Sequence, residues 1–75
     1  MKLAHTSHKN GRAEILDTDD GEKVVGRSKR EPFPLGGYIY EITTVSGERV
    51  YKGNAMSSGL AALKWHIERD QATHS

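Results

Sequence analysis

The stretch YIYEITTVSGERVYKG, residues 38–53, decides the fold, because it predicts two β-strands joined by a tight turn. Its first half alternates Tyr, Ile, Tyr, Glu and Ile, and Ser46-Gly47 marks the turn. With a two-residue turn, Val45 pairs with Glu48 and successive side chains alternate between two faces. One face then carries Tyr38, Tyr40, Ile42, Thr44, Arg49 and Tyr51. All three tyrosines of the chain therefore lie on that face.

A single helix is expected after the hairpin. Four apolar residues recur there at helical spacing and form one narrow stripe. They are Met56, Leu60, Leu63 and Ile67. Ser57 or Ser58 is expected to cap the helix, since a serine hydroxyl accepts the unpaired amide protons at a helix start. The apolar pattern fades after Asp70, and we expect the tail at 71–75 to be frayed.

The one tryptophan, Trp65, points almost opposite to this apolar stripe, on the same side as Arg69. One interpretation is that its ring leans over to cover a strand edge or the N-terminal hairpin. The other is that it anchors a partner protein, because an exposed Trp beside an Arg is a favoured composition of binding hot spots. The sequence leaves both interpretations open.

The helix must cover one face of the hairpin, and the two choices have different consequences. If it covers the tyrosines, they belong to the core and their hydroxyls reach its rim. If it covers Ile39, Val45 and Val50 instead, the exposed tyrosines and Arg49 form a surface on which unpaired bases stack. A small core needs its large rings, which favours buried tyrosines.

Two more turns precede this hairpin and complete the prediction of an α+β fold. Asn10-Gly11 lies between two short strand-like stretches, and DTDDG at 17–21 marks a second turn. We expect an antiparallel β-meander of four or five short strands with one C-terminal α-helix packed on the sheet. The expected core residues are Leu16, Val24, Ile42, Val50, Leu60, Leu63 and Ile67.

The segment at 29–37 is expected to be a flexible connection within the domain. Its two prolines and two glycines cannot continue a strand ladder. Arg27, Lys29 and Arg30 adjoin it and form the one basic cluster of the sequence. A mobile basic loop can bind phosphates, and each contact adds to a salt-dependent affinity. The plain alternative is a solvated loop.

Length and composition restrict the class of protein. Seventy-five residues make a single domain, 1–75, and the absence of cysteine fits a reducing, cytoplasmic setting. No apolar run is long enough for a membrane span, and the N-terminus has no signal-peptide core. Eleven Lys and Arg nearly balance ten Asp and Glu, so binding to nucleic acid must depend on how charge is distributed. Lys9 and Arg12 would extend the basic cluster only if folding brings them beside it.

We expect no metal, no cofactor and no enzymatic activity. His5 and His8 are three residues apart and would point to opposite faces of a strand, where they cannot hold one metal ion together. His66 lies on the helix flank and His74 in the tail. The turn at 17–21 lacks the spaced ligands of a calcium loop. The sequence contains no recognisable Ser-His-Asp set, paired carboxylates or Gly-rich phosphate loop.

IYEI at 39–42 and VYKG at 50–53 resemble the two signature strands of GIY-YIG nuclease domains, and a helix with His66 near its end follows them. The resemblance spans about residues 37–66. In that family the tyrosines and a helix arginine act on the scissile phosphate, and a later glutamate holds a metal ion. Here Leu60-Ala61-Ala62 occupies the arginine region, and no later strand and helix supply the glutamate. The resemblance therefore implies the hairpin and helix without nuclease activity.

The same segment also resembles the three-stranded sheet plus helix of plant ethylene-response DNA-binding domains and phage-integrase arm-binding domains. GNAMSSGLAAL at 53–63 carries this likeness, since a strand there ends in Gly and a Ser precedes an alanine-rich helix. Those domains insert their sheet into the major groove, so the resemblance implies DNA as the partner. They line the sheet with Arg and Trp, whereas this hairpin offers Arg49 and Lys52.

The sequence thus leaves two functional hypotheses from different classes. The first is a small non-enzymatic module that binds DNA or RNA through a basic loop and the hairpin face. Its site residues would be Arg27, Lys29, Arg30, Arg49, Tyr38, Tyr40 and Tyr51. The second is a protein-interaction module, such as a compact phage-type inhibitor or adaptor, which presents Trp65 and Arg69 to its partner. Neither hypothesis involves a membrane.

Overall fold

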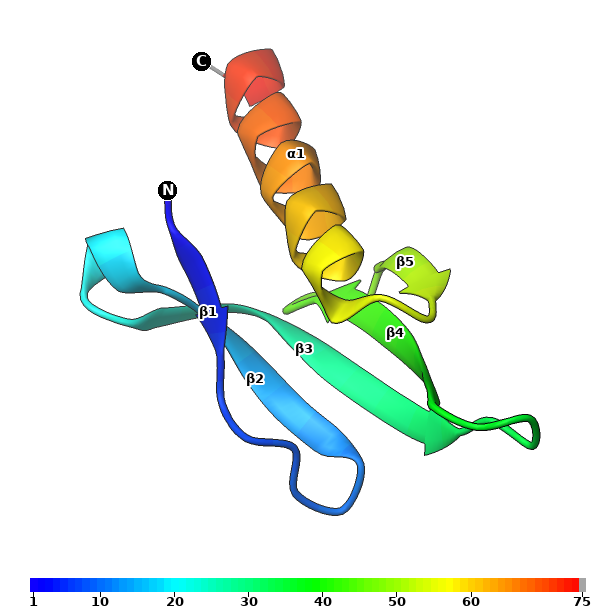
Figure 1. The fold of residues 1–75 in the computed structure, drawn as a ribbon. Helices are drawn as coiled ribbons and strands as arrows, with labels where there is room; N and C mark the ends of the chain where they lie inside the picture. Colours follow the sequence, from blue (N-terminus) through cyan, green and yellow to red (C-terminus); the bar gives the residue numbers. More distant parts are fainter. Residues whose placement is uncertain (75) are drawn as a thin grey trace.

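The computed structural model describes the backbone of residues 1–74 and the side chains of residues 1–71. Its elements are β1 (Leu3–His5), β2 (Arg12–Asp17), the 3₁₀ turn η1 (Thr18–Asp20), β3 (Lys23–Pro32), β4 (Tyr38–Thr44), β5 (Arg49–Gly53) and α1 (Met56–His74). The five strands form one antiparallel sheet in chain order, and α1 packs on one side of it (Figure 1). The predicted α+β meander with a C-terminal helix is confirmed.

Local turn chemistry sets the strand boundaries in the first half of the sheet. Asn10 and Gly11 have φ angles of 55° and 76°, the geometry that a two-residue hairpin turn demands. Around them Lys9 and Arg12 exchange backbone hydrogen bonds of 2.8 and 3.1 Å. The next turn contains η1 and ends at Gly21, whose φ is 63°. Both predicted turns are therefore confirmed.

The core lies between α1 and one face of the sheet, which we call the covered face. Ile15 of β2, Ile42 of β4 and Leu63 of α1 are fully buried there. The residues packed around them are Leu3, Val25, Val50, Tyr51, Met56, Leu60 and Ile67. The predicted helical stripe is thus confirmed. Leu16 and Val24 are wrong as core residues, because they pair with each other outside this cluster.

Two glycines allow α1 to approach the sheet closely. A Cβ atom on Gly26 of β3 would lie 2.7 Å from the Leu63 side chain. A Cβ atom on Gly59 of α1 would lie 2.7 Å from the Ile42 side chain. Glycine is a poor helix former, so its presence in the first half of α1 is explained by packing and not by helix propensity.

A β-bulge in β3 explains why the core uses a different valine from the predicted one. Ile15 pairs with Gly26, but the next pair is Leu16 with Val24, so Val25 is the extra residue. An extra residue breaks the regular alternation of side chains along a strand. As a result Val25 packs on the core and Val24 does not belong to it.

The loop between β4 and β5 is one residue longer than predicted. The Thr44 amide donates to the Glu48 carbonyl at 2.8 Å, so the loop contains residues 45–47 and not Ser46-Gly47 alone. Gly47 closes it with a φ of 95°. The predicted pairing of Val45 with Glu48 is therefore wrong.

This longer loop shifts the start of β5 and moves a charged residue to the other face. Ile42 pairs with Tyr51 and Thr43 pairs with Arg49, so Val50 is the extra residue of a second bulge. The guanidinium of Arg49 lies on the side of Glu41, 4.0 Å from its carboxylate. The predicted position of Arg49 on the tyrosine face is wrong for this reason.

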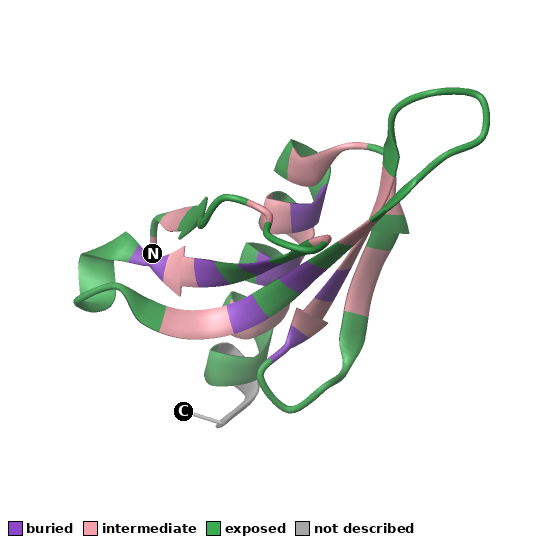
Figure 2. Ribbon diagram, turned by 90° about the horizontal axis from the view of Figure 1, so that it is seen from below, coloured by how far each residue is buried: buried purple, intermediate pink, exposed green. Residues whose placement is uncertain are grey.

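β3 extends further than expected and includes the basic cluster. It continues to Pro32, so the predicted connection at 29–37 shortens to residues 33–37. Figure 2 shows this loop as exposed along its whole length. Arg27, Lys29 and Arg30 are therefore strand residues with fixed neighbours, and the prediction of a basic loop is wrong.

The ends of α1 also differ from the prediction. The helix begins at Met56, so Ser57 and Ser58 lie inside its first turn and do not precede it as caps. It continues to His74, so the predicted frayed tail at 71–75 is helical up to that residue. Ser75 lies outside the described residues.

Candidate nucleic-acid interface

The face of the sheet opposite α1 is called the open face here (Figure 1). Two rows of mostly charged residues run across its strands. One row consists of Arg12, Lys29, Glu41 and Lys52. The neighbouring row consists of Glu14, Arg27, Thr43 and Arg49. Five cations and two carboxylates give these rows a formal charge of +3, compared with +1 for the whole chain. The fold therefore concentrates on one surface a positive charge that the composition hides.

Like charges stand next to each other within these rows. Arg12 pairs directly with Lys29 across β2 and β3, an arrangement that destabilises a sheet. Lys29 has a carboxylate of Glu31 at 3.4 Å, and both side chains are more than half exposed. Exposed ion pairs of this kind are weak because water and salt screen them. A polyanion could therefore replace such partners at little cost.

A groove runs along the open face beside the segment that connects β1 to β2. The cations that line it are Lys9, Arg12, Arg27 and Lys29. Sequence reasoning did not assign Lys9, Arg12 or Lys52 to the site. The Asn10-Gly11 turn places Lys9 opposite Arg12, but their position beside Lys29 depends on the β2–β3 register, and that of Lys52 on the β4–β5 register.

The structure separates the predicted site residues into two groups. Arg27, Lys29 and Arg49 lie together on the open face. Arg30 and the three tyrosines alternate with them and lie on the side of the covered face. The basic cluster and the tyrosines therefore do not form one continuous surface.

Only one tyrosine is held beneath the helix. Tyr51 packs on the core, and its hydroxyl accepts the Ala55 amide proton at 3.3 Å just before α1 begins. Tyr38 lies nearer the other end of the hairpin and remains 40% exposed. The expectation of buried tyrosines is thus correct only in part, because Tyr51 packs on the core, Tyr40 is partly buried and Tyr38 is exposed.

Tyr38 and Tyr40 belong to an aromatic cluster that also contains two histidines. The ring centroids of His5 and His8 are 5.5 Å apart, those of His8 and Tyr40 5.6 Å, and those of Tyr40 and Tyr38 6.3 Å. The Arg30 guanidinium lies 4.3 Å from the Tyr38 ring centre. His5 and His8 meet because His8 lies outside β1, so the predicted separation of their side chains is wrong.

Within this aromatic cluster, His8 is hydrogen-bonded to the buried side chain of Ser28. Its Nε2 lies 2.9 Å from the Ser28 hydroxyl, which donates to the Met56 sulfur at 3.5 Å. Since that hydroxyl proton is used, Nε2 is the donor of the first bond. Burial lowers the pKa of His8 from 6.5, and the nearby charges of Arg30 and His5 lower it further. A neutral ring fits this arrangement.

The tryptophan of α1 lies on the outer side of the helix. Trp65 is 63% exposed, so the interpretation in which it covers a strand edge is wrong. The Arg69 guanidinium lies 5.0 Å from its ring centre, in the range of a cation–π contact. The structure therefore places the two residues of the second hypothesis side by side.

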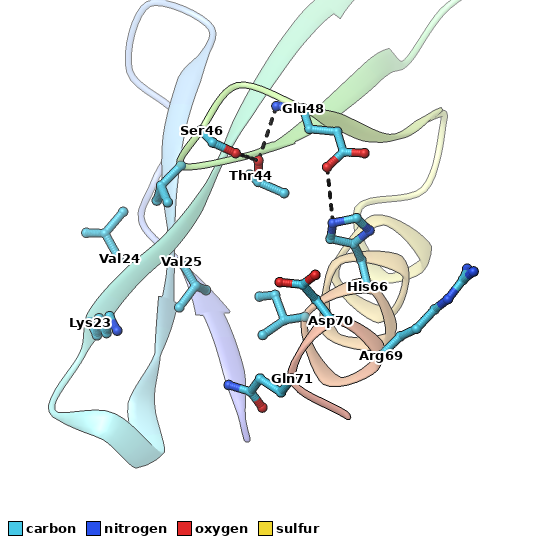
Figure 3. Close-up of a pocket in the computed structure, with 12 residues that line it drawn as sticks. Lys23, Val24, Val25, Thr44, Ser46, Glu48, His66, Arg69, Asp70 and Gln71 are labelled. Carbon is cyan, nitrogen blue, oxygen red and sulfur yellow. Dashed lines mark hydrogen bonds and ion pairs between the residues drawn. The ribbon is translucent and has the colours of Figure 1, made fainter. Parts of the chain in front are cut away.

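A second groove lies between the later turns of α1 and the nearby ends of β3 and β4 (Figure 3). Val25 and Ile67 contribute apolar surface to it. The Nε2 atom of His66 lies 3.3 Å from the Glu48 carboxylate, and this contact joins the helix to the β4–β5 loop across one end. Cations and carboxylates line this groove in equal numbers, Lys23 and Arg69 against Glu48 and Asp70, whereas four cations and the two carboxylates of Glu14 and Glu41 line the groove of the open face.

Residues 1–74 contain no group of three or more His, Cys, Asp or Glu placed to hold a metal ion, as far as their side chains are described. Within the same part of the chain, no helix is long and apolar enough to cross a membrane. Comparison with models of known protein families, with curated proteins and with solved structures gave no match.

Proposed function

We propose that this protein is a small non-enzymatic nucleic-acid-binding module whose open face contacts duplex DNA. The observation that carries the proposal is the concentration of five cations in two adjacent cross-strand rows, on a surface that α1 leaves free. Arginine and lysine are the residues that neutralise backbone phosphates and read guanine edges. The like-charged pair of Arg12 and Lys29 supports this role, because a phosphate placed between them would remove their repulsion.

The dimensions of the sheet favour duplex DNA over duplex RNA. Neighbouring strands lie about 4.8 Å apart, so the four strands that carry the two rows span about 14 Å, comparable with the width of about 12 Å of the DNA major groove. The major groove of RNA is deep and narrow and does not admit such a surface. The resemblance to ethylene-response and arm-binding domains, which insert a sheet in this way, agrees with the proposal.

The test is a fluorescence-anisotropy titration of a labelled duplex of about 20 base pairs at about 50 and about 200 mM salt. We expect weak binding that falls steeply with salt, because each neutralised phosphate contributes about 0.9 to the logarithmic slope. Replacing Arg27 and Lys29 together by Ala should lower that slope by about 1.8. The control is the double replacement of Lys23 and Lys64 by Ala, which removes the same charge outside the two rows.

The outcomes separate cleanly. A loss of affinity and slope in the Arg27/Lys29 variant alone supports the open face as the interface. Equal losses in both double variants would mean that only net charge matters and that the open face is not a site. Tighter binding to duplex RNA or single strands than to duplex DNA would contradict the choice of ligand. No binding even at low salt would overturn the proposal as a whole.

The exposed Trp65 supports a second candidate function, which is binding of a partner protein through the outer side of α1. An indole that is 63% exposed, with an arginine over its ring, has the composition of an interface hot spot. Trp65→Ala should abolish capture of a protein partner and leave the unfolding curve unchanged. A large loss of stability in that variant would show that the ring serves the fold instead.

A further inference from the structure

The β3–β4 hairpin ends in an apolar loop, Phe33–Gly37, which we call the tip loop. Two backbone hydrogen bonds order it, from the Phe33 amide to the Gly37 carbonyl at 3.0 Å and from the Gly36 amide to the Phe33 carbonyl at 2.9 Å. Gly36 and Gly37 adopt φ angles of 105° and 74°, which an L-residue rarely takes. The tip loop is therefore a built turn and not a loose linker.

This turn presents large apolar side chains to solvent. Leu35 is 89% exposed at its centre, and Phe33 and Tyr38 beside it are also exposed. Single exposed apolar residues are common on protein surfaces, but three at one hairpin end form a patch that contributes little to the core. Pro34 stiffens the turn between Phe33 and Leu35, so the side chains are held outward at low entropic cost.

Cations lie on both faces of the β3 strand that leads to the tip loop, and Glu31 lies between them and the loop. Arg27 and Lys29 point to the open face, and Arg30 points to the other side, above the Tyr38 ring. The nearest carboxylate on β3 is Glu31, which is paired with Lys29 at 3.4 Å. The hairpin therefore has an uncharged, apolar end and cations along β3. This pattern complements a duplex, because a duplex has phosphates on its outside and stacked bases on its inside.

We propose that the tip loop acts as a wedge, in which Leu35 inserts between stacked base pairs of duplex DNA and kinks it. This inference rests on the proposed function, because the open face must first hold the duplex. Apolar side chains that enter a base step from the minor groove unstack it and bend DNA by roughly 20–90°. The stem supplies phosphate contacts through Arg27 and Lys29, and the tip supplies the contact with the bases.

The experiment measures DNA bending by energy transfer between dyes at the two ends of a random-sequence duplex of about 20 base pairs. The native chain should shorten the end-to-end distance and raise the transfer efficiency at saturation. Leu35→Ser should bind with an affinity within about threefold of the native chain, because the phosphate contacts remain. Its saturated complex should show the transfer efficiency of free DNA.

The control is Val45→Ser, which removes a large apolar side chain that is 54% exposed in the β4–β5 loop. That loop contains residues 45–47 and lies at the end of β4 opposite to the tip loop. Val45→Ser should bend DNA like the native chain. Unfolding curves of both variants should match the native curve, because neither side chain belongs to the core.

Each result has a definite meaning. Bending by the native chain and by Val45→Ser but not by Leu35→Ser supports the wedge. Binding without bending by the native chain overturns the wedge and leaves the proposed function intact. Absence of any binding overturns the proposed function itself. Binding of the native chain, but not of Leu35→Ser, to vesicles of phosphatidylcholine and phosphatidylserine, together with equal bending by both, would identify a membrane-binding loop instead.

Discussion

The two faces of this sheet are built from the same strands and differ in nearly every physical respect. On the covered face, residues small enough for close approach lie beneath α1: Gly26 lies against Leu63, and the buried Ser28 bonds to the Met56 sulfur. On the open face the alternate residues of the same strands are charged, and Arg27 and Lys29 flank Ser28 in β3. Alternation along a strand assigns neighbours to opposite faces. One stretch of sequence therefore encodes both a core surface and a candidate binding surface.

The comparison shows that the residues that stabilise this small domain and the residues of its candidate binding surface lie on opposite faces of the sheet. A chain of 75 residues has a total stability of about 4–11 kcal/mol. Few residues can contribute to it, and the fully buried large side chains are concentrated at Ile15, Ile42 and Leu63. Substitutions on the covered face should therefore act on folding, and substitutions on the open face should act on binding.

The largest effect is expected from Leu63→Ala, the most direct way to break the covered face. Leu63 is fully buried, and leucine-to-alanine changes at such sites cost about 2–5 kcal/mol. Urea denaturation followed by circular dichroism measures the loss. The control is Leu16→Ala, which removes the same atoms from a partly buried position outside the core and should cost less than half as much. Equal losses would mean that the open side also carries a core.

A smaller effect is expected from Gly59→Ala, which tests close packing against helix propensity. Propensity alone predicts a gain of about 1 kcal/mol. The new Cβ would lie 2.7 Å from Ile42 and 3.0 Å from Tyr51, and overpacking of this kind costs about 1–3 kcal/mol. We therefore expect a net loss of stability. Ser58→Ala, at the exposed neighbouring position, should instead be neutral or slightly stabilising, and a gain for both variants would contradict the close contact.

A pH-dependent effect is expected at the border of the covered face, where His8 bonds to Ser28. The folded-state pKa of His8 lies below 6.5, so the unfolded chain binds more protons as pH falls through that value. As the pH falls from about 7.5 to about 5.5, proton uptake by His8 in the unfolded chain should therefore lower the free energy of unfolding. Chemical denaturation at several pH values should give a flatter dependence for His8→Gln than for the native chain. An unchanged or steeper dependence would contradict a neutral His8.

The smallest effect on stability is expected on the open face itself, from Glu41→Gln. Its carboxylate lies 4.0 Å from the Arg49 guanidinium, and exposed pairs of this kind contribute at most about 1 kcal/mol. The unfolding midpoint should hardly move. Affinity for duplex DNA should rise by roughly a few-fold, because one negative charge leaves the basic rows. Glu68→Gln on α1 removes the same charge far from those rows, so an equal rise there would point to net charge alone.

Much of the fold follows from local patterns in the sequence. The Asn10-Gly11 turn and the apolar stripe around Leu63 specify a meander and a helix, because turn geometry and helical periodicity depend on residues close together in the chain. The angle of Trp65 to that stripe indicated that it points away from the core, but only the structure decided that its ring is exposed and does not cover a strand edge. The sequence also revealed part of the candidate basic cluster, because Arg27 and Lys29 are only two residues apart in the chain.

What the sequence alone determined is thus the kind and order of the elements, while the tertiary structure decided which residues share a surface. The two bulges moved Val25 into the core and Arg49 to the open face, and the β2–β3 register brought Arg12 opposite Lys29. A shift of one residue reverses the face of every side chain beyond it, and it is selected by packing against α1. The strand register depends on contacts between residues that are far apart in the chain, so no short stretch of the sequence determines it.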